Sequence, residues 1–305
     1  MGPILFGVAY LECVPNISEG RRVEVIDELS DGFASARGVL LADVSSDVDH
    51  NRTVFTLFGD PAALSEALFV FHETALRSVD LGRHRGVHPR IGVVDVTPFV
   101  ALTADDRNRA IAVARTFGKR VGGELGVPVF LYSMAARAGG LQVPAALRSL
   151  SASEIASRLA KGSLQPDFGP RFWDESVGVA LIGARGPLIA FNLLLETSEV
   201  AVARSIARTV RESGDGLPGV QALGVGLESR GCAQVSTNVL DFQSTSIYEL
   251  HEAVCAEAAA LGTAVVSTEL VGLLPRAALE QGDVESLRLE DFDETKIIET
   301  HLGKL

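Results

Sequence analysis

Apolar periodicity divides this chain into two halves that share one order of strands and helices, β-α-β-β-α-β. In the first half we expect strands at 4–14, 39–44, 53–58 and 91–100, and helices at 19–36 and from residue 60. In the second half we expect strands at 188–195, 220–227, 233–240 and 263–267, and helices at 199–212 and 245–260. This order is typical of ferredoxin-like domains. We therefore predict an α+β fold of two such βαββαβ domains in tandem, with a ligand cleft between them.

Residues 165–170 (QPDFGP) mark the predicted junction between the halves, because two prolines and a glycine in six residues indicate irregular structure. A further helix at 105–125, a strand at 127–132 and a helical stretch near 142–161 extend the first half. We predict an N-terminal domain at 1–176, and a C-terminal domain at 177–305 that includes a charged tail with a helix at 296–302.

Composition excludes several classes of protein. The chain has 305 residues and a net charge of −12, which argues against a nucleic-acid partner. Its three cysteines are widely spaced and form no CxxC pair, which favours a reducing compartment over a disulfide framework or a zinc site. No apolar run reaches the roughly 18 residues of a membrane span. We expect a soluble, cytoplasmic protein without a bound metal and without a membrane or nucleic-acid partner.

The segment 81–92 (LGRHRGVHPRIG) is the candidate site. Two of the six histidines and three arginines fall within residues 83–90, between glycines and beside a proline. This composition fits a structured loop that arranges imidazoles and cations around an anion, and histidine can both accept and donate a proton near neutral pH. The alternative interpretation is a solvated basic turn.

Short motifs spread over residues 8–280 carry a family resemblance. They are ECVPNISEG at 12–20, NRTV at 51–54, HPRIG at 88–92 with Asp95-Val96 and Pro98-Phe99, PVFLY at 128–132, PDFGP at 166–170, LIAFN at 188–192, QVSTN at 234–238 with Asp241, and ELVGL at 269–273. In this order they resemble the formiminotransferase part of the formiminotransferase–cyclodeaminase family. The separate cyclodeaminase domain of its bifunctional members has no counterpart in these motifs.

The resemblance implies a reaction and a catalytic group. A formimino group would pass from N-formimino-L-glutamate to N5 of tetrahydrofolate, the co-substrate, giving 5-formiminotetrahydrofolate and L-glutamate. The family's catalytic histidine matches His88, which would act as general acid and base. His84 is either a substrate-binding or a supporting histidine. The family also implies a homodimer.

Further residues are assigned to the site with an alternative structural role for each. Arg90 and Arg52 are either carboxylate clamps or partners in salt bridges, and Asp43 either assists His88 or caps a turn. The remaining substrate-binding candidates are Asn51, Asn192, Gln234 and Asn238, the last three in strands where they either face the cleft or satisfy the sheet. The folate-contacting stretch of the family falls on Gly169, Pro170, Arg171, Phe172 and Gly178.

Three positions depart from the family pattern. Val87 and Met134 replace glutamates, and Leu194 replaces an asparagine. These changes keep two alternatives open: a folate-binding paralogue without catalysis, and a related transferase that uses N-formylglutamate or another donor.

Overall fold

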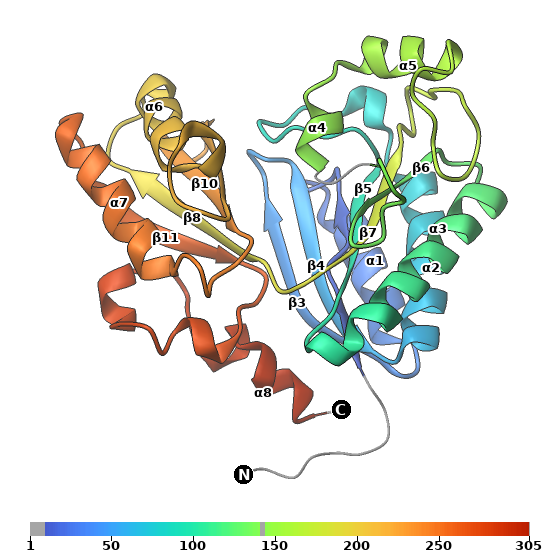
Figure 1. Ribbon diagram of the computed structural model, residues 1–305, viewed down its shortest axis with the longest axis horizontal. Coiled ribbons are helices and arrows are strands. Elements are labelled where there is room, and N and C mark those ends of the chain that lie inside the picture. Colours follow the sequence, from blue (N-terminus) through green and yellow to red (C-terminus); the bar gives the residue numbers. More distant parts are fainter. Residues whose placement is uncertain (1–9, 141–143, 305) are drawn as a thin grey trace. The chain divides into compact units, whose positions relative to one another are not determined.

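The computed structural model describes residues 10–140 and 144–304, coloured along the chain in Figure 1. These residues form two compact units. The first comprises the chain up to Ser46 with 51–85 and 89–186, and the second comprises 47–50, 86–88 and 187–305. Each unit is built on its own β-sheet, so the predicted α+β class is confirmed and the two sheets agree with two domains.

The sheet of the first unit has seven strands within the described residues. They are β1 (Leu11–Cys13), β2 (Asn16–Ile17), β3 (Val39–Asp47), β4 (Arg52–Gly59), β5 (Val94–Val100), β6 (Val129–Ser133) and β7 (Ala180–Arg185). Both β1 and β2 pair with β4 on one side and β5 on the other, and β3 pairs with β4. Strand β7 lies parallel between β5 and β6.

Three helices cover one face of this sheet: α1 (Val23–Ala34), α2 (Pro61–Ser78) and α3 (Arg107–Glu124). They bury an aromatic core in which the rings of Phe33 and Phe71 stack at 4.7 Å. Helix α2 begins where the sequence predicts, because the Asp60 carboxylate accepts hydrogen bonds from the first amides of the helix.

The opposite face is covered in part by α4 (Pro144–Arg148) and α5 (Ala152–Ala160). Leu147 and Ile155 pack there against Phe130 and Leu181, whereas the neighbouring Leu131 and Ile182 face the aromatic core. This alternation is the period of two that a strand imposes on its side chains.

The second unit has a four-stranded antiparallel sheet in the order β11-β8-β10-β9. The strands are β8 (Ile189–Leu195), β9 (Val220–Leu227), β10 (Cys232–Val239) and β11 (Val265–Val271), and the helices are α6 (Val200–Val210), α7 (Ile247–Ala260) and α8 (Ile298–Leu302). Phe191 and Leu193 of β8 are buried in the core with α6 and α7. Asn192 and Leu194 therefore point to the other face.

Short 3-10 helices complete the described structure: Leu81–Arg83, Ala104–Asp106, Glu212–Gly214, Arg276–Ala278, Val284–Leu287 and Glu294–Lys296. The C-terminal tail belongs to the second unit, where the amide of Leu274 donates to the carbonyl of Lys296 at 3.0 Å. The tail helix expected at 296–302 is α8.

The structure differs from the expected elements in four places. Residues 4–9 of the first expected strand lie outside the described residues, and the remainder is β1, which Pro15, without an amide hydrogen for the ladder, separates from the unexpected β2. Helix α1 begins at Val23, not at 19, because Glu19 accepts hydrogen bonds from the amides of Arg21 and Arg22. The stretch at 142–161, whose first two residues are not described, is two helices separated by a capping box at Ser151. Strand β7 was not expected.

Candidate functional site

The histidine loop follows the 3-10 helix Leu81–Arg83, and its main chain is held near both ends. In the first unit, His84 Nε2 donates to the carbonyl of Asn51 at 2.6 Å, and Asn51 Nδ2 donates to the carbonyl of Arg85 at 3.1 Å. Beyond the loop, the amide of Ile91 donates to Asp95 Oδ1 at 2.9 Å. Hydrogen bonds within the first unit therefore hold the loop at both ends.

Asn51 holds this part of the first unit through all of its side-chain polar atoms. Its Oδ1 accepts a hydrogen bond from the amide of Gly20 at 2.9 Å, while Nδ2 is bound to Arg85. Its φ of 48° lies in the left-handed region, which asparagine tolerates better than most residues. The substrate-binding candidate thus has its amide engaged by the protein's own backbone.

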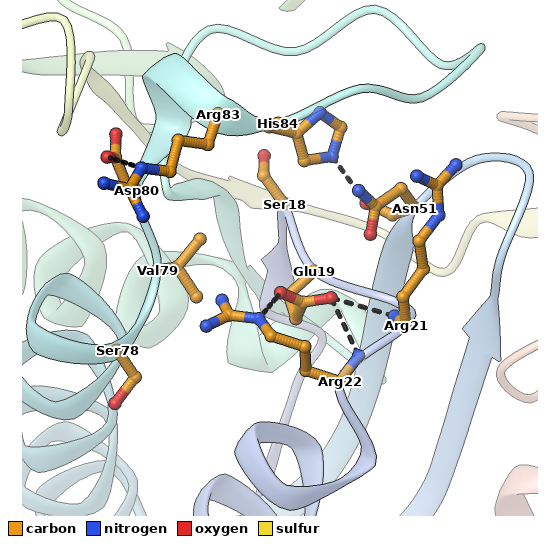
Figure 2. A pocket seen from close by; sticks show the side chains of 10 residues that line it. All are labelled: Ser18, Glu19, Arg21, Arg22, Asn51, Ser78, Val79, Asp80, Arg83 and His84. Carbon is orange, nitrogen blue, oxygen red and sulfur yellow. Dashed lines mark hydrogen bonds and ion pairs between the residues drawn. The ribbon is translucent and has the colours of Figure 1, made fainter.

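A cavity of about 390 Å³ opens beside Asn51 and His84 within the first unit (Figure 2). Its lining residues are Ser18, Glu19, Arg21, Arg22, Asn51, Ser78, Val79, Asp80, Arg83 and His84. Arg22 Nε lies 2.5 Å from Glu19 Oε2, and Arg83 Nε lies 3.2 Å from Asp80 Oδ2. The lining contains three guanidinium groups and two carboxylates, so the cavity carries excess positive charge in a chain that is acidic overall. It suits an anionic group.

His84 is uncharged near neutral pH. Burial, together with a smaller contribution from the nearby guanidinium of Arg90, lowers its pKa to about 4, although the bond to Asn51 opposes the shift. The neutral ring carries its hydrogen on Nε2, because that atom faces a carbonyl oxygen. His84 therefore supports the loop as a hydrogen-bond donor.

Arg52 and Asp95 form a buried ion pair in the first unit. Arg52 Nη1 lies 2.9 Å from Asp95 Oδ2, and Arg52 Nε donates to Asn16 Oδ1 at 3.0 Å. Arg148 of α4 contacts the same carboxylate oxygen. Burial would raise the pKa of Asp95, but Arg148 and Arg52 outweigh it and hold that pKa well below its usual range. The geometry agrees with the salt-bridge alternative for Arg52.

Arg90 and Asp43 both form hydrogen bonds within the first unit. Arg90 Nη2 donates to the carbonyl of His84 at 2.7 Å, and its Nε is buried without a hydrogen-bond partner among the described residues. Asp43 lies on β3 and accepts a hydrogen bond from Ser45 Oγ at 2.6 Å. Arg90 thus braces the loop that contains His88.

His88 itself belongs to the second unit, together with the turn that follows β3. Its ring centroid lies 5.9 Å from that of His50, and the two rings are inclined by 53°. The amide of Val87 donates to the carbonyl of Asp49 at 3.0 Å. Two imidazoles are therefore held side by side by the backbone.

A polar chain leads from this pair onto the sheet of the second unit. His50 Nε2 lies 3.0 Å from Gln234 Oε1, and Gln234 Nε2 donates to Glu269 Oε2 at 3.4 Å. Asn192 Nδ2 donates to the same carboxylate oxygen at 3.2 Å. The structure therefore brings Gln234 and Asn192 together on the face of the sheet opposite to α6 and α7. Asn238, four residues beyond Gln234 on β10, points to that face too.

Comparison with known sequences identifies the family of the chain. The family model described as "Formiminotransferase domain, N-terminal subdomain" matches residues 10–185, and that described as "Formiminotransferase domain" matches residues 190–302. The chain is a member of the formiminotransferase family.

Similar curated proteins match almost the whole chain. It is 39% identical over 293 residues to glutamate formimidoyltransferase of Streptococcus pyogenes serotype M1, covering 96% of this chain and 98% of that protein. It is 37% identical to glutamate formimidoyltransferase of Thermoplasma acidophilum, covering 97% and 98% respectively. It is 42% identical to formimidoyltransferase-cyclodeaminase of Sus scrofa, covering 88% of this chain and 51% of the longer protein.

The segment that the family resemblance assigns to folate lies in the first unit. Gly169 and Gly178 have φ of 82° and 74°, and a Cβ at either would lie 2.2 Å from a backbone oxygen, that of Val127 or Ile91. Close packing of the chain thus requires both glycines. Between them Phe172 is 57% exposed, whereas Trp173 packs against the core. Pro170 is half-buried, and the exposed Arg171 donates to Gln165 Oε1 at 3.4 Å.

The three departures from the formiminotransferase pattern have different surroundings. Leu194 is 2% exposed and packs against Val225 and Leu227, so it fills an apolar site of the second unit. Met134 packs against the core of the first unit. Val87, beside His88, is 40% exposed and is the most exposed of the three.

Sequence reasoning missed His50 and Glu269 as members of the polar chain. The one available signal was the run of polar residues in the apolar strand β10, because buried amides need partners. Among the described residues, no group of three or more His, Cys, Asp or Glu is arranged to hold a metal ion. None of the helices in the described ranges has the length and apolarity of a membrane span.

Proposed function

We propose that this protein transfers the formimino group of N-formimino-L-glutamate to N5 of tetrahydrofolate, giving 5-formiminotetrahydrofolate and L-glutamate. The observation that carries the proposal is the match to two proteins named glutamate formimidoyltransferase over 96% or more of this chain and 98% of theirs. Because the similarity extends over nearly the whole length of both proteins, it favours a common activity over a single shared domain in proteins of different activity.

His88 is the proton carrier in this proposal. N5 of the folate attacks the formimino carbon, and the N5 hydrogen passes to the imidazole. The bond from that carbon to the glutamate nitrogen then breaks, and the same proton passes from His88 to the departing nitrogen. The half-buried setting of His88 beside the His50 ring supports this role, because a fixed imidazole loses little order on reaching the transition state.

Both substrates carry carboxylates, which the basic side chains of the first unit would bind. The cavity lined by Arg21, Arg22 and Arg83 supports binding of a glutamyl carboxylate. The exposed Phe172 and Arg171 support contact with a pterin face and a glutamyl tail. Asn192, Gln234 and Asn238 belong to the same proposal as polar groups on one face of the second sheet.

The finer architecture is also a proposal. The chain order β8-α6-β9-β10-α7-β11, with the spatial order β11-β8-β10-β9, supports a ferredoxin-like second domain. In the first unit, β3, β4, the β1/β2 pair and β5 support the same topology, extended by β7 and β6. The ligand cleft, the homodimer and the cytoplasmic location stay predictions, and sedimentation velocity tests the dimer.

The experiment is turnover of purified protein with tetrahydrofolate and N-formimino-L-glutamate, with N-formyl-L-glutamate in parallel, for wild type and His88→Ala. We expect product from the formimino donor and a loss of about 10²-fold or more in His88→Ala. Product from the formyl donor alone would instead favour the related transferase. No product with either donor, in a protein that still binds folate, would favour the non-catalytic paralogue.

A further inference from the structure

The second unit contains a histidine that none of the proposed steps uses. His50 lies between β3 and β4, is 8% exposed, and faces the His88 ring at 5.9 Å. Its own amide donates to Asp47 Oδ1 at 2.6 Å, and the carboxylate of Asp49 binds the amide of Ser229 at 3.1 Å. The turn is thus anchored independently of the His50 ring, and the ring is left to contact Gln234 and His88.

The hydrogen-bond chain fixes which nitrogen of His50 carries a hydrogen. Glu269 accepts hydrogen bonds from the amides of both Gln234 and Asn192, so its carboxylate acts as an acceptor. Gln234 must therefore turn its NH₂ group toward Glu269 and its carbonyl oxygen toward His50. Because a carbonyl oxygen only accepts, His50 Nε2 bears the hydrogen that lies between them at 3.0 Å.

We propose that His50 is a positioning residue for His88. We also propose that the side chain of Gln234, which lies between His50 and Glu269, keeps the Glu269 carboxylate from contacting the imidazole pair. The inference rests on the proposed role of His88 as proton carrier. His50 orients the neighbouring ring through contact and does not itself touch the reacting atoms.

An amide at position 234 has a consequence that a carboxylate would not have. A carboxylate bound directly to His50 would stabilise the charged imidazolium form of that ring. A cation 5.9 Å away would then oppose protonation of His88, which must hold a proton between the two halves of the transfer. The charged groups that face the turn, Asp47, Asp49 and Glu269, are each bound to an amide or a hydroxyl instead.

The test compares the pH profiles of kcat and kcat/KM for wild type, His50→Gln, Gln234→Glu and the control Gln221→Glu. Gln221 is half-buried on the adjacent strand β9, so its substitution adds the same charge away from His50. We expect Gln234→Glu to move the acidic limb of kcat/KM to lower pH by about one unit, because His50 becomes charged. We expect His50→Gln to lower kcat by about tenfold with KM within about twofold, and Gln221→Glu to keep the acidic limb at its wild-type pH.

Histidine ¹⁵N NMR of the folded wild-type protein supplies a second readout that does not need activity. We expect the His50 signals of the Nε2–H form in wild type, and a mixture of tautomers in Glu269→Gln, where the Gln234 amide is free to rotate. An Nδ1–H form in wild type would overturn the proposal. Wild-type kcat in His50→Gln, or identical profiles for Gln234→Glu and Gln221→Glu, would overturn it too. Full activity of His88→Ala would reject the proton carrier but leave the NMR result on His50 intact.

Discussion

His84 donates to the main-chain carbonyl of Asn51 across 2.6 Å, and this bond connects the histidine loop to the start of β4. Because Nε2 holds the hydrogen of this bond, proton transfer would fall to Nδ1, and that atom is buried. Since burial also keeps His84 uncharged, its hydrogen bond is best understood as support for the loop. In the proposed reaction the two histidines of the motif therefore have separate tasks, His84 in the first unit and His88 in the second.

Substitution of Asn51 tests how strongly this support depends on one side chain. Asn51→Ala removes the bonds to Gly20 and Arg85 and places alanine at a φ of 48°. We expect a loss of about 3 kcal/mol in the free energy of unfolding, from two hydrogen bonds and the backbone conformation. Asn51→Gly removes the same bonds without backbone strain, so urea unfolding should show a smaller loss of about 2 kcal/mol. Equal losses for the two variants would show that the conformation costs nothing.

Removal of the Asp95 charge should be among the most damaging single changes. Asp95→Asn leaves Arg52 and Arg148 buried beside each other without a counter-charge. We expect a loss of about 3–5 kcal/mol in the free energy of unfolding, measured in urea. Glu66→Gln breaks the exposed pair with Arg120 and should cost less than about 1 kcal/mol. A small effect of Asp95→Asn would mean that water reaches the two guanidinium groups.

Glu12 makes stability depend on pH. Burial raises its pKa from 4.5 to about 7, although Arg185 opposes the shift. Between these values the folded carboxyl keeps its proton while the unfolded one ionises, so the stability that Glu12 contributes is present below pH 4.5 and is lost as pH rises through 7. Glu12→Gln has no such carboxyl to ionise. We therefore expect the free energy of unfolding of Glu12→Gln, minus that of wild type, to rise by about 3 kcal/mol from pH 4.5 to pH 8. Urea unfolding across this range measures it, and the exposed Glu24→Gln should run parallel to wild type.

Gly178 and Gly162 separate a steric requirement from a conformational one. Both have φ above 70°, but a Cβ at Gly178 would lie 2.2 Å from the carbonyl oxygen of Ile91, whereas Gly162 faces open space. We expect Gly162→Ala to cost about 1 kcal/mol and Gly178→Ala about 3 kcal/mol or more, because the backbone beside it must shift. Thermal unfolding of the two variants provides the comparison. Similar midpoints would contradict the close packing beside the histidine loop.

Local patterns in the sequence predicted most of the elements, because capping groups and apolar spacing act within a few residues. The Asp60-Pro61 start of α2 and the strand at 220–227 are examples. Strand β7 was missed because the short, mainly apolar run at 180–185 lacks the apolar–polar alternation of a strand with one exposed face. Strands buried on both faces generally lack it. The run follows an irregular loop and gives no hint that it enters the sheet parallel to β5.

The candidate site was predictable where its chemistry is concentrated in a few consecutive residues, as around His88. The partner of His50 is Gln234, 184 positions away, and no local spacing could join them. For Arg52, sequence reasoning left a choice between a ligand clamp and a salt bridge, since a guanidinium serves both. Only the position of Asp95 in the folded chain shows which group it contacts.

The assignment of residues 47–50 and 86–88 to the second unit limits how this molecule can be divided. A fragment cut after Gly186 would carry Ser229 and Gln234 without Asp49 and His50, the residues that bind them. Either half, transferred alone into another protein, would leave these polar groups without their hydrogen-bond partners. We expect the two halves to have been inherited together. A deletion in the β3–β4 turn would also remove a hydrogen-bond partner of Ser229, more than a hundred residues later in the chain.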